Sequence, residues 1–187
     1  MAPRIAAATV AEHREQQERA ILLAARRLLA SEGTAITLAG VAREAGLART
    51  SLYQYYASLD ALLDALVLDI FPQWTERVVS AMAAANDPGE RVVAYVVANL
   101  ELVAEGEHAV IRGLAMNAPR QLTEASKELH EQLRRPLDEA LGGDTMAAEL
   151  VQSWVFAGSR MIEDGRELAE VRETIERLLR PYCAGLG

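Results

Sequence analysis

The apolar residues of this 187-residue chain recur three or four positions apart along almost its whole length. This spacing is the period of an amphipathic α-helix, whereas a half-buried strand needs strict alternation of apolar and polar residues. No alternating run bounded by turn residues occurs, so the sequence predicts an all-α protein. Hydrophobic residues make up 51% of the chain, which is enough to bury a sizeable core.

The chain lacks the sequence features of membrane and secreted proteins. Its longest apolar run, residues 92–98, is far shorter than the roughly 20 residues of a membrane-spanning helix. Only a short alanine-rich stretch precedes Glu12, unlike the apolar region of a secretory signal. The single cysteine, Cys183, cannot form an intrachain disulfide. We therefore expect a cytoplasmic protein with no membrane partner.

Capping residues and helix breakers divide the chain into helices. Thr37, Ser58, Asp87 and Asp144 have side chains that cap helix starts, and Pro72 should kink or break the helix that contains it. The helices are predicted at residues 12–31, 38–46, 49–56, from 59 past 70, 89–105, 119–141, 145–164 and 167–182.

Charge is distributed unevenly along the chain. The formal net charge of −8 argues against a general nucleic-acid binder. Residues 1–56, however, hold seven Arg and five Glu, a net charge of +2, whereas residues 57–187 carry −10. The first third is therefore the part of the chain whose charge suits a polyanion.

Residues 37–56 form the most informative segment. They give two short helices joined by a turn that contains Gly46, with Ala42 and Ala45 small enough for the helices to cross closely. This pattern predicts a helix-turn-helix. On the second helix Leu47 and Leu52 face inward, and the polar residues suit phosphates and major-groove bases. A plain helical hairpin with a polar outer face is the alternative.

The same segment carries a family resemblance. It is similar to the DNA-binding domain of the TetR family of bacterial transcriptional regulators over about residues 14–66, on the following residues: Thr37, Val41, Ala42, Ala45, Gly46, Leu47, Ser51, Leu52, Tyr53, Gln54, Tyr55, Tyr56, Ser58, Leu62 and Leu63. The resemblance implies a homodimer that binds a palindromic operator, usually as a repressor that a small ligand releases. Two residues depart from the family pattern: Ala48 stands where a Ser or Thr usually caps the recognition helix, and Leu59 where a Lys commonly reaches a phosphate.

We accordingly expect an N-terminal three-helix DNA-binding domain, residues 1–56, and a larger C-terminal helical domain for dimerisation and ligand binding, residues 57–187. Within the first, the predicted base readers are Arg49, Thr50, Ser51 and Gln54. The predicted phosphate contacts are Thr37, Tyr53 and Tyr55.

The last two long helices carry wide apolar stripes that predict a dimer interface. The residues assigned to it are Ala147, Val151, Gly158, Ile162, Val171, Ile175 and Leu178. The alternative is that both stripes belong to the core of a single chain.

A cavity for a small hydrophobic ligand would use large or polar residues on otherwise apolar helices. The candidates are Trp74, Tyr95, Asn99, His108, Arg112, Met116 and Trp154. Such residues can also be ordinary core or surface positions, so this prediction depends on how the helices pack.

The sequence gives little support for an enzyme, a metal site or a cofactor site. The three histidines are scattered, and His130-Glu131 is followed by Arg134 where a zinc-protease motif needs its second His. No glycine-rich phosphate loop occurs. We expect a DNA-binding transcriptional regulator without catalytic residues, metal or cofactor. The alternative is a helical dimeric binding or scaffold protein whose DNA-binding head is degenerate.

Overall fold

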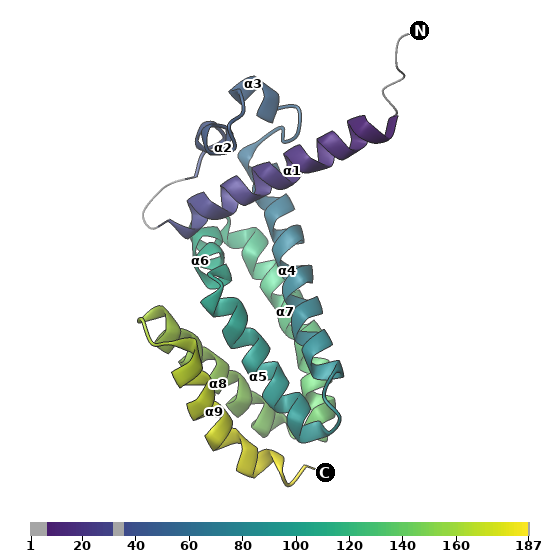
Figure 1. Cartoon of the computed structure of the whole chain (residues 1–187), viewed down its shortest axis with the longest axis vertical. Coiled ribbons are helices and arrows are strands. Elements are labelled where there is room, and N and C mark those ends of the chain that lie inside the picture. The colour runs from purple at the N-terminus through teal and green to yellow at the C-terminus, as the bar shows by residue number, and fades with distance from the viewer. Residues whose placement is uncertain (1–6, 32–35, 187) are drawn as a thin grey trace. The chain divides into compact units, whose positions relative to one another are not determined.

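The computed structural model describes residues 7–31 and 36–186, and the regular structure in these ranges is helical (Figure 1). This confirms the predicted all-α fold. The helices are α1 Ala7–Ala30, α2 Leu38–Glu44, α3 Arg49–Leu52, α4 Leu59–Ala83, α5 Pro88–Ala104, α6 Glu107–Asn117, α7 Pro119–Ala140, α8 Thr145–Glu163 and α9 Leu168–Cys183. Among the described helices none is both long and apolar enough to cross a membrane.

Side-chain caps fix four of the helix starts. The Thr37 hydroxyl accepts a hydrogen bond from the Gly40 amide at 3.1 Å, and the Ser58 hydroxyl accepts one from the Ala61 amide at the same distance. The carboxylates of Asp87 and Asp144 cap α5 and α8 in the same way. Each cap satisfies an amide that has no partner within its own helix, so these four predictions are confirmed.

Pro72 was predicted to kink or break its helix, and the break is wrong, because α4 continues through Pro72 to Ala83. Proline removes the hydrogen bond to the carbonyl four residues earlier, which here belongs to Leu68. Pro72 is exposed and the Leu68 side chain is 73% exposed, so this part of α4 faces solvent and water can bind that carbonyl.

The recognition helix is shorter than predicted. Regular α-helix ends at Leu52, and the chain then tightens, with the amides of Gln54 and Tyr55 each bonding to the carbonyl three residues earlier. This tighter turn keeps Tyr53 and Gln54 at the surface.

The helices form two compact units. The first comprises residues up to Leu68 together with Ala109–Gln121, and the second comprises the remainder, so α4, α6 and α7 each contribute to both. In the first unit α1 packs on α2, and α2 packs on α3. Gly113 of α6 lies so close to α1 that a Cβ there would be 2.3 Å from the Leu29 carbonyl oxygen.

In the second unit α5 packs against both α8 and α9, and these two also contact each other (Figure 1). Gly158 permits this close approach. A Cβ at this position would lie 2.7 Å from Leu100 Cδ2 of α5 and 2.9 Å from Ile175 Cδ1 of α9. The small residue in the middle of α8 thus accommodates helices of its own chain.

Candidate functional site

The turn between α2 and α3 is built on Gly46. Its φ of +69° lies in the left-handed region, which a residue with a Cβ adopts only at a cost. The amide of Leu47 bonds back to the Ala42 carbonyl at 2.8 Å and closes the end of α2. This turn fixes the angle at which α3 leaves α2.

Gly40 lies inside α2, where a glycine is ordinarily unfavourable. A Cβ at Gly40 would lie 3.2 Å from the hydroxyl oxygen of Thr37, which caps the same helix. A side chain at Gly40 would therefore require the Thr37 hydroxyl to move by a few tenths of an ångström.

Helix α3, the second helix of the helix-turn-helix, presents its polar residues to solvent. Leu52 is fully buried and anchors α3, whereas Arg49, Thr50, Tyr53 and Gln54 are exposed. Thr37 is also exposed, and Ser51 and Tyr55 are half-buried. All seven predicted DNA contacts therefore lie in the first unit, on or next to α2 and α3.

Two arginines rest on the tyrosines that follow α3. The Arg49 guanidinium donates to the Tyr53 hydroxyl at 3.3 Å and lies 5.8 Å from the centre of the Tyr53 ring. Arg14, on α1, lies 5.5 Å from the centre of the Tyr55 ring. Sequence reasoning missed Arg14, although it lies two helical turns before the buried Ile21 and so on the same face of α1.

Three of the predicted ligand residues come together in the core of the second unit. The indole of Trp74 donates to Asn99 Oδ1 at 2.9 Å, and Asn99 Nδ2 donates to the Tyr95 carbonyl at 2.8 Å. All three side chains are buried. These contacts join α4 to α5 by a polar link inside an apolar core.

The other predicted ligand residues lie elsewhere. His108 pairs with Glu163 at 2.7 Å, and Trp154 lines a groove between α8 and α9. Arg112 and Met116 belong to the first unit, and the Met116 side chain is 67% exposed. The prediction that these residues contact a ligand stays a prediction.

Most residues predicted for the dimer interface face the core of their own chain. Ala147, Val151, Gly158, Val171 and Ile175 are buried in the second unit. Ile162 is half-buried and Leu178 is 60% exposed. Their part in a dimer stays a prediction.

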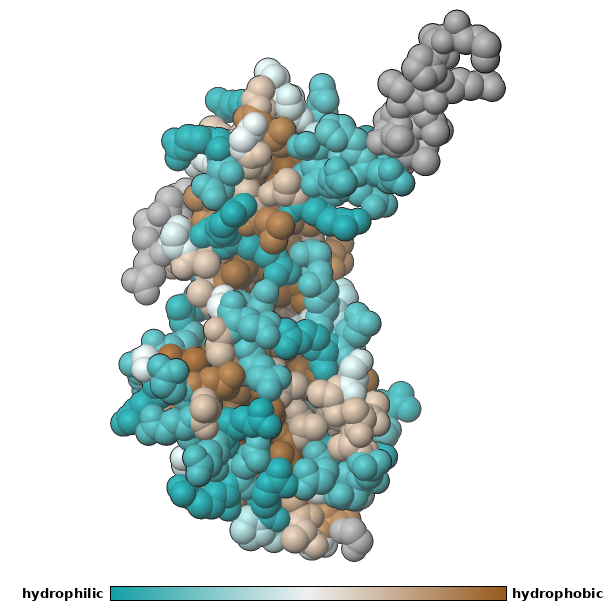
Figure 2. Space-filling model, viewed as in Figure 1, coloured by the Kyte–Doolittle hydropathy of each residue, from teal (hydrophilic) through white to brown (hydrophobic). Residues whose placement is uncertain are grey.

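The same two helices also carry large apolar side chains that face solvent. Phe156 of α8 is one of them, and we call the other five the α8/α9 apolar surface: Met146, Leu150, Met161, Leu178 and Tyr182. Figure 2 shows apolar residues gathered over these helices. A stripe read from spacing alone is too broad to separate its inward-facing from its outward-facing members, which is why the sequence did not isolate this set.

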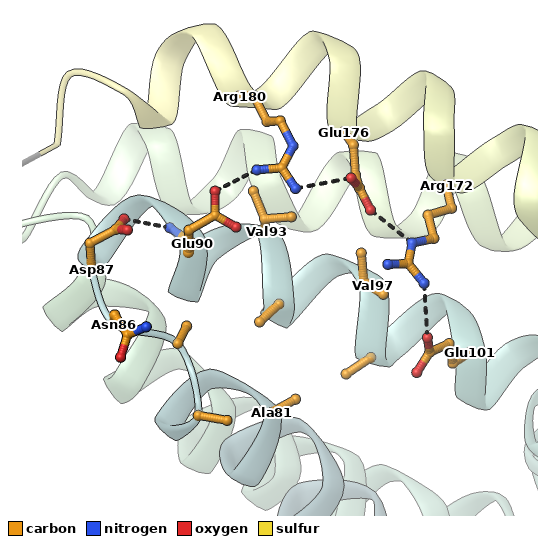
Figure 3. A pocket seen from close by; sticks show the side chains of 14 residues that line it. Ala81, Asn86, Asp87, Glu90, Val93, Val97, Glu101, Arg172, Glu176 and Arg180 are labelled. Carbon is orange, nitrogen blue, oxygen red and sulfur yellow. Dashed lines mark hydrogen bonds and ion pairs between the residues drawn. The ribbon is translucent and has the colours of Figure 1, made fainter.

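A shallow groove of about 420 Å³ lies beside α5 and α9 (Figure 3). Its rim carries a continuous chain of ion pairs, in which Arg180, Glu176 and Arg172 of α9 lie between Glu90 and Glu101 of α5. The hydrogen bond from Arg172, with a second from Arg180, lowers the pKa of the Glu176 carboxyl. These arginines already bind carboxylates, so the rim holds α9 against α5.

Comparison with known proteins agrees with the helix-turn-helix geometry. The family described as bacterial regulatory proteins, tetR family, matches residues 21–66. The HTH-type transcriptional regulator BetI of Rhizobium meliloti (strain 1021) is 29% identical over 114 residues, which cover 60% of this chain and 56% of that regulator. The match therefore spans little more than half of BetI.

Solved structures share the fold over most of the chain. A TetR-like transcriptional regulator from Rhodococcus sp. RHA1 has a TM-score of 0.71 at 20% identity, covering 90% of this chain and 96% of that one. The regulator FadR from Bacillus subtilis, solved in complex with stearoyl-CoA, has a TM-score of 0.67 at 18% identity, covering 86% and 96%. At these identities the likeness concerns the fold.

Residues 21–66 are therefore assigned to the TetR family of bacterial regulatory proteins, and the rest of the chain shares the fold of a TetR-like structure. The chain's two departures from the TetR pattern are visible in the structure. Ala48 has the extended backbone of a helix cap but makes no side-chain cap bond to α3. Leu59 is half-buried at the start of α4, where a phosphate-binding lysine is common in the family.

The buried Tyr95 predicts a dependence of stability on alkaline pH. Burial raises the pKa of its hydroxyl to about 12, partly offset by a hydrogen bond with Gln152. The unfolded chain releases this proton near pH 10, whereas the folded chain releases it only near pH 12. The free energy of unfolding should therefore fall by about 2–3 kcal/mol as the pH rises through this window. Below about pH 10 this contribution is fully present.

The measurement is urea unfolding at a series of alkaline pH values for the wild type and for Tyr95→Phe. Other groups also titrate in this range, so the difference between the two proteins is the quantity of interest. The variant should lose less stability than the wild type as the pH rises. Equal losses in both proteins would contradict the assignment.

Proposed function

We propose that this protein is a DNA-binding transcriptional regulator, acting as a repressor that binds a palindromic operator as a homodimer. The observation that carries the proposal is the exposed polar face of α3, held by the buried Leu52 beneath it. Residues 1–56, whose net charge is +2, would read DNA, and residues 57–187 would dimerise and bind a ligand.

The side chains of this face suit the two kinds of DNA contact. Arg49 and Gln54 carry donors that can pair with guanine and adenine edges in the major groove. Tyrosine and threonine hydroxyls suit phosphate oxygens, which fix the register of a protein on the duplex without reading its sequence. Arg49 must leave Tyr53 to reach a base, so Tyr53 would hold it ready in the free protein.

The α8/α9 apolar surface supports the homodimer. Exposed apolar patches of this kind mark sites of association on soluble proteins. A two-fold contact places the same residues of both copies together, so one such surface is sufficient to close a dimer. The buried residues of the predicted interface would then support this surface from behind.

A small hydrophobic ligand would release the protein from DNA. The polar link between Trp74 and Asn99 is the part of the apolar core that could orient such a molecule. The complex of Bacillus subtilis FadR with stearoyl-CoA supports an apolar chain as the ligand class. The alternative function, a dimeric scaffold with a degenerate head, would show no preference among DNA sequences.

Selection of binding sites from random DNA tests the proposal. The selected sites should be inverted repeats whose half-sites lie about 10 bp apart or a multiple of that distance. Arg49→Ala should relax the preference by about 1–3 kcal/mol at one position per half-site, because a bidentate base contact is lost. Tyr53→Phe should weaken all sites alike. Selected sites without a two-fold repeat would contradict the proposal.

The dimer is tested by placing a charge on the α8/α9 apolar surface. Leu150→Glu should convert a dimer, with twice the 20.3 kDa mass of the chain, into a monomer in light scattering. Thr145→Glu is the matched control, because it adds the same charge at an exposed position of α8 outside this surface. A wild-type protein that is monomeric at micromolar concentration would exclude this interface.

Ligand binding is tested by adding stearoyl-CoA to the Trp154→Phe variant. This variant keeps Trp74 as its single tryptophan. Binding should change the Trp74 fluorescence and weaken operator affinity. By linkage, saturating operator must weaken stearoyl-CoA binding by the same factor. Binding that leaves operator affinity unchanged would show that this site does not regulate.

A further inference from the structure

Helix α1 extends well beyond the part of the chain that matches the TetR family. It begins at Ala7, whereas the match begins at residue 21. The first half of α1 is nevertheless joined to the recognition segment, because the Arg14 guanidinium lies over the ring of Tyr55. Tyr55 follows α3 by three residues.

We propose that Arg14 binds the DNA backbone and that Tyr55 is its positioning residue, which adds the extension of α1 to the DNA interface. The inference rests on the proposed DNA-binding function and extends it to a residue outside the family match. The expected partner is a phosphate group of duplex DNA, next to the bases that α3 would read.

The geometry favours a phosphate contact. Arginine is always charged, and its planar guanidinium can rest one face on an aromatic ring while its N–H edge binds phosphate. Arg14 also donates through Nε to Glu18 at 3.1 Å, and its side chain is still 63% exposed. The ring and Glu18 hold the head of a long side chain in place, which reduces the entropy lost when it binds.

The same helix provides a matched control. Arg19 is also exposed, at 73%, and also pairs with a glutamate one turn away, Glu15, at 2.9 Å. Unlike Arg14, Arg19 does not lie over an aromatic ring of the described part of the chain. Replacing either arginine by alanine removes one charge and one ion pair from α1.

The experiment measures the affinity of the full-length protein for a random-sequence duplex over a range of salt concentrations. Each phosphate contact contributes about −0.9 to the slope of log affinity against log salt. Arg14→Ala should reduce the magnitude of this slope by about one per protomer and weaken binding about tenfold at low salt. Arg19→Ala should leave the slope unchanged.

Variants of Tyr55 separate positioning from direct contact. Tyr55→Phe removes the hydroxyl predicted to contact phosphate but keeps the ring under Arg14, so adding Arg14→Ala to it should still reduce the salt slope by about one per protomer. Tyr55→Leu removes the ring and should lose most of the affinity that depends on Arg14, so that adding Arg14→Ala to it costs little more. Circular dichroism shows whether Tyr55→Leu stays folded, and Arg14→Ala, at an exposed site, tests the proposal independently.

The outcomes are distinct. Equal slopes for Arg14→Ala and the wild type, or equal losses for Arg14→Ala and Arg19→Ala, would overturn the inference while the DNA-binding function stands. A wild-type protein that binds neither random nor selected duplexes would overturn the proposed function itself.

Discussion

Helix α5 is buried over most of its surface, and the packing of the second unit depends on the burial of this helix. The buried residues are Gly89, Val92, Val93, Tyr95, Val96, Ala98, Asn99, Leu100, Leu102 and Val103. A helix that is apolar over most of its surface must be covered over most of it, and the stripe of α5 that contains Glu90 and Glu101 is the side left open at the groove. Helices α8 and α9 cover part of α5, and the glycine at position 158 lets them come close. The exposed ion pairs at the rim contribute at most about 1 kcal/mol each, so apolar burial dominates this packing.

Asn99 adds specificity to that burial. Its amide is satisfied at both ends, by the indole of Trp74 and by the Tyr95 carbonyl. A buried polar group left without a partner costs about 1–3 kcal/mol, so α4 and α5 can slide past each other only by losing this bond. One polar side chain thus selects one alignment of two helices whose apolar surfaces would permit several.

Much of the fold could be predicted from local signals, because capping is a property of a few neighbouring residues. Thr37 and Asp144 start their helices as their sequence contexts indicate. A break at Pro72 does not occur, and the sequence could not decide this because the outcome depends on whether the freed carbonyl faces water, which requires the tertiary structure. In the candidate site, too, local features could be predicted and tertiary contacts could not. The exposed face of α3 is predictable from spacing, whereas the contact between Arg14 and Tyr55 joins residues 41 positions apart and leaves no local pattern.

The position of Arg14 on a continuous helix constrains how this chain can vary. Each residue of an α-helix turns the chain by about 100° and advances it by about 1.5 Å. Deleting one residue between Arg14 and Ile21 would therefore swing the guanidinium to another side of α1, away from Tyr55. Substitutions in this stretch preserve the contact, but single insertions and deletions do not. The stretch between Arg14 and Ile21 can thus change in composition but not in length, because even a whole extra turn would move Arg14 by about 5.4 Å along the axis.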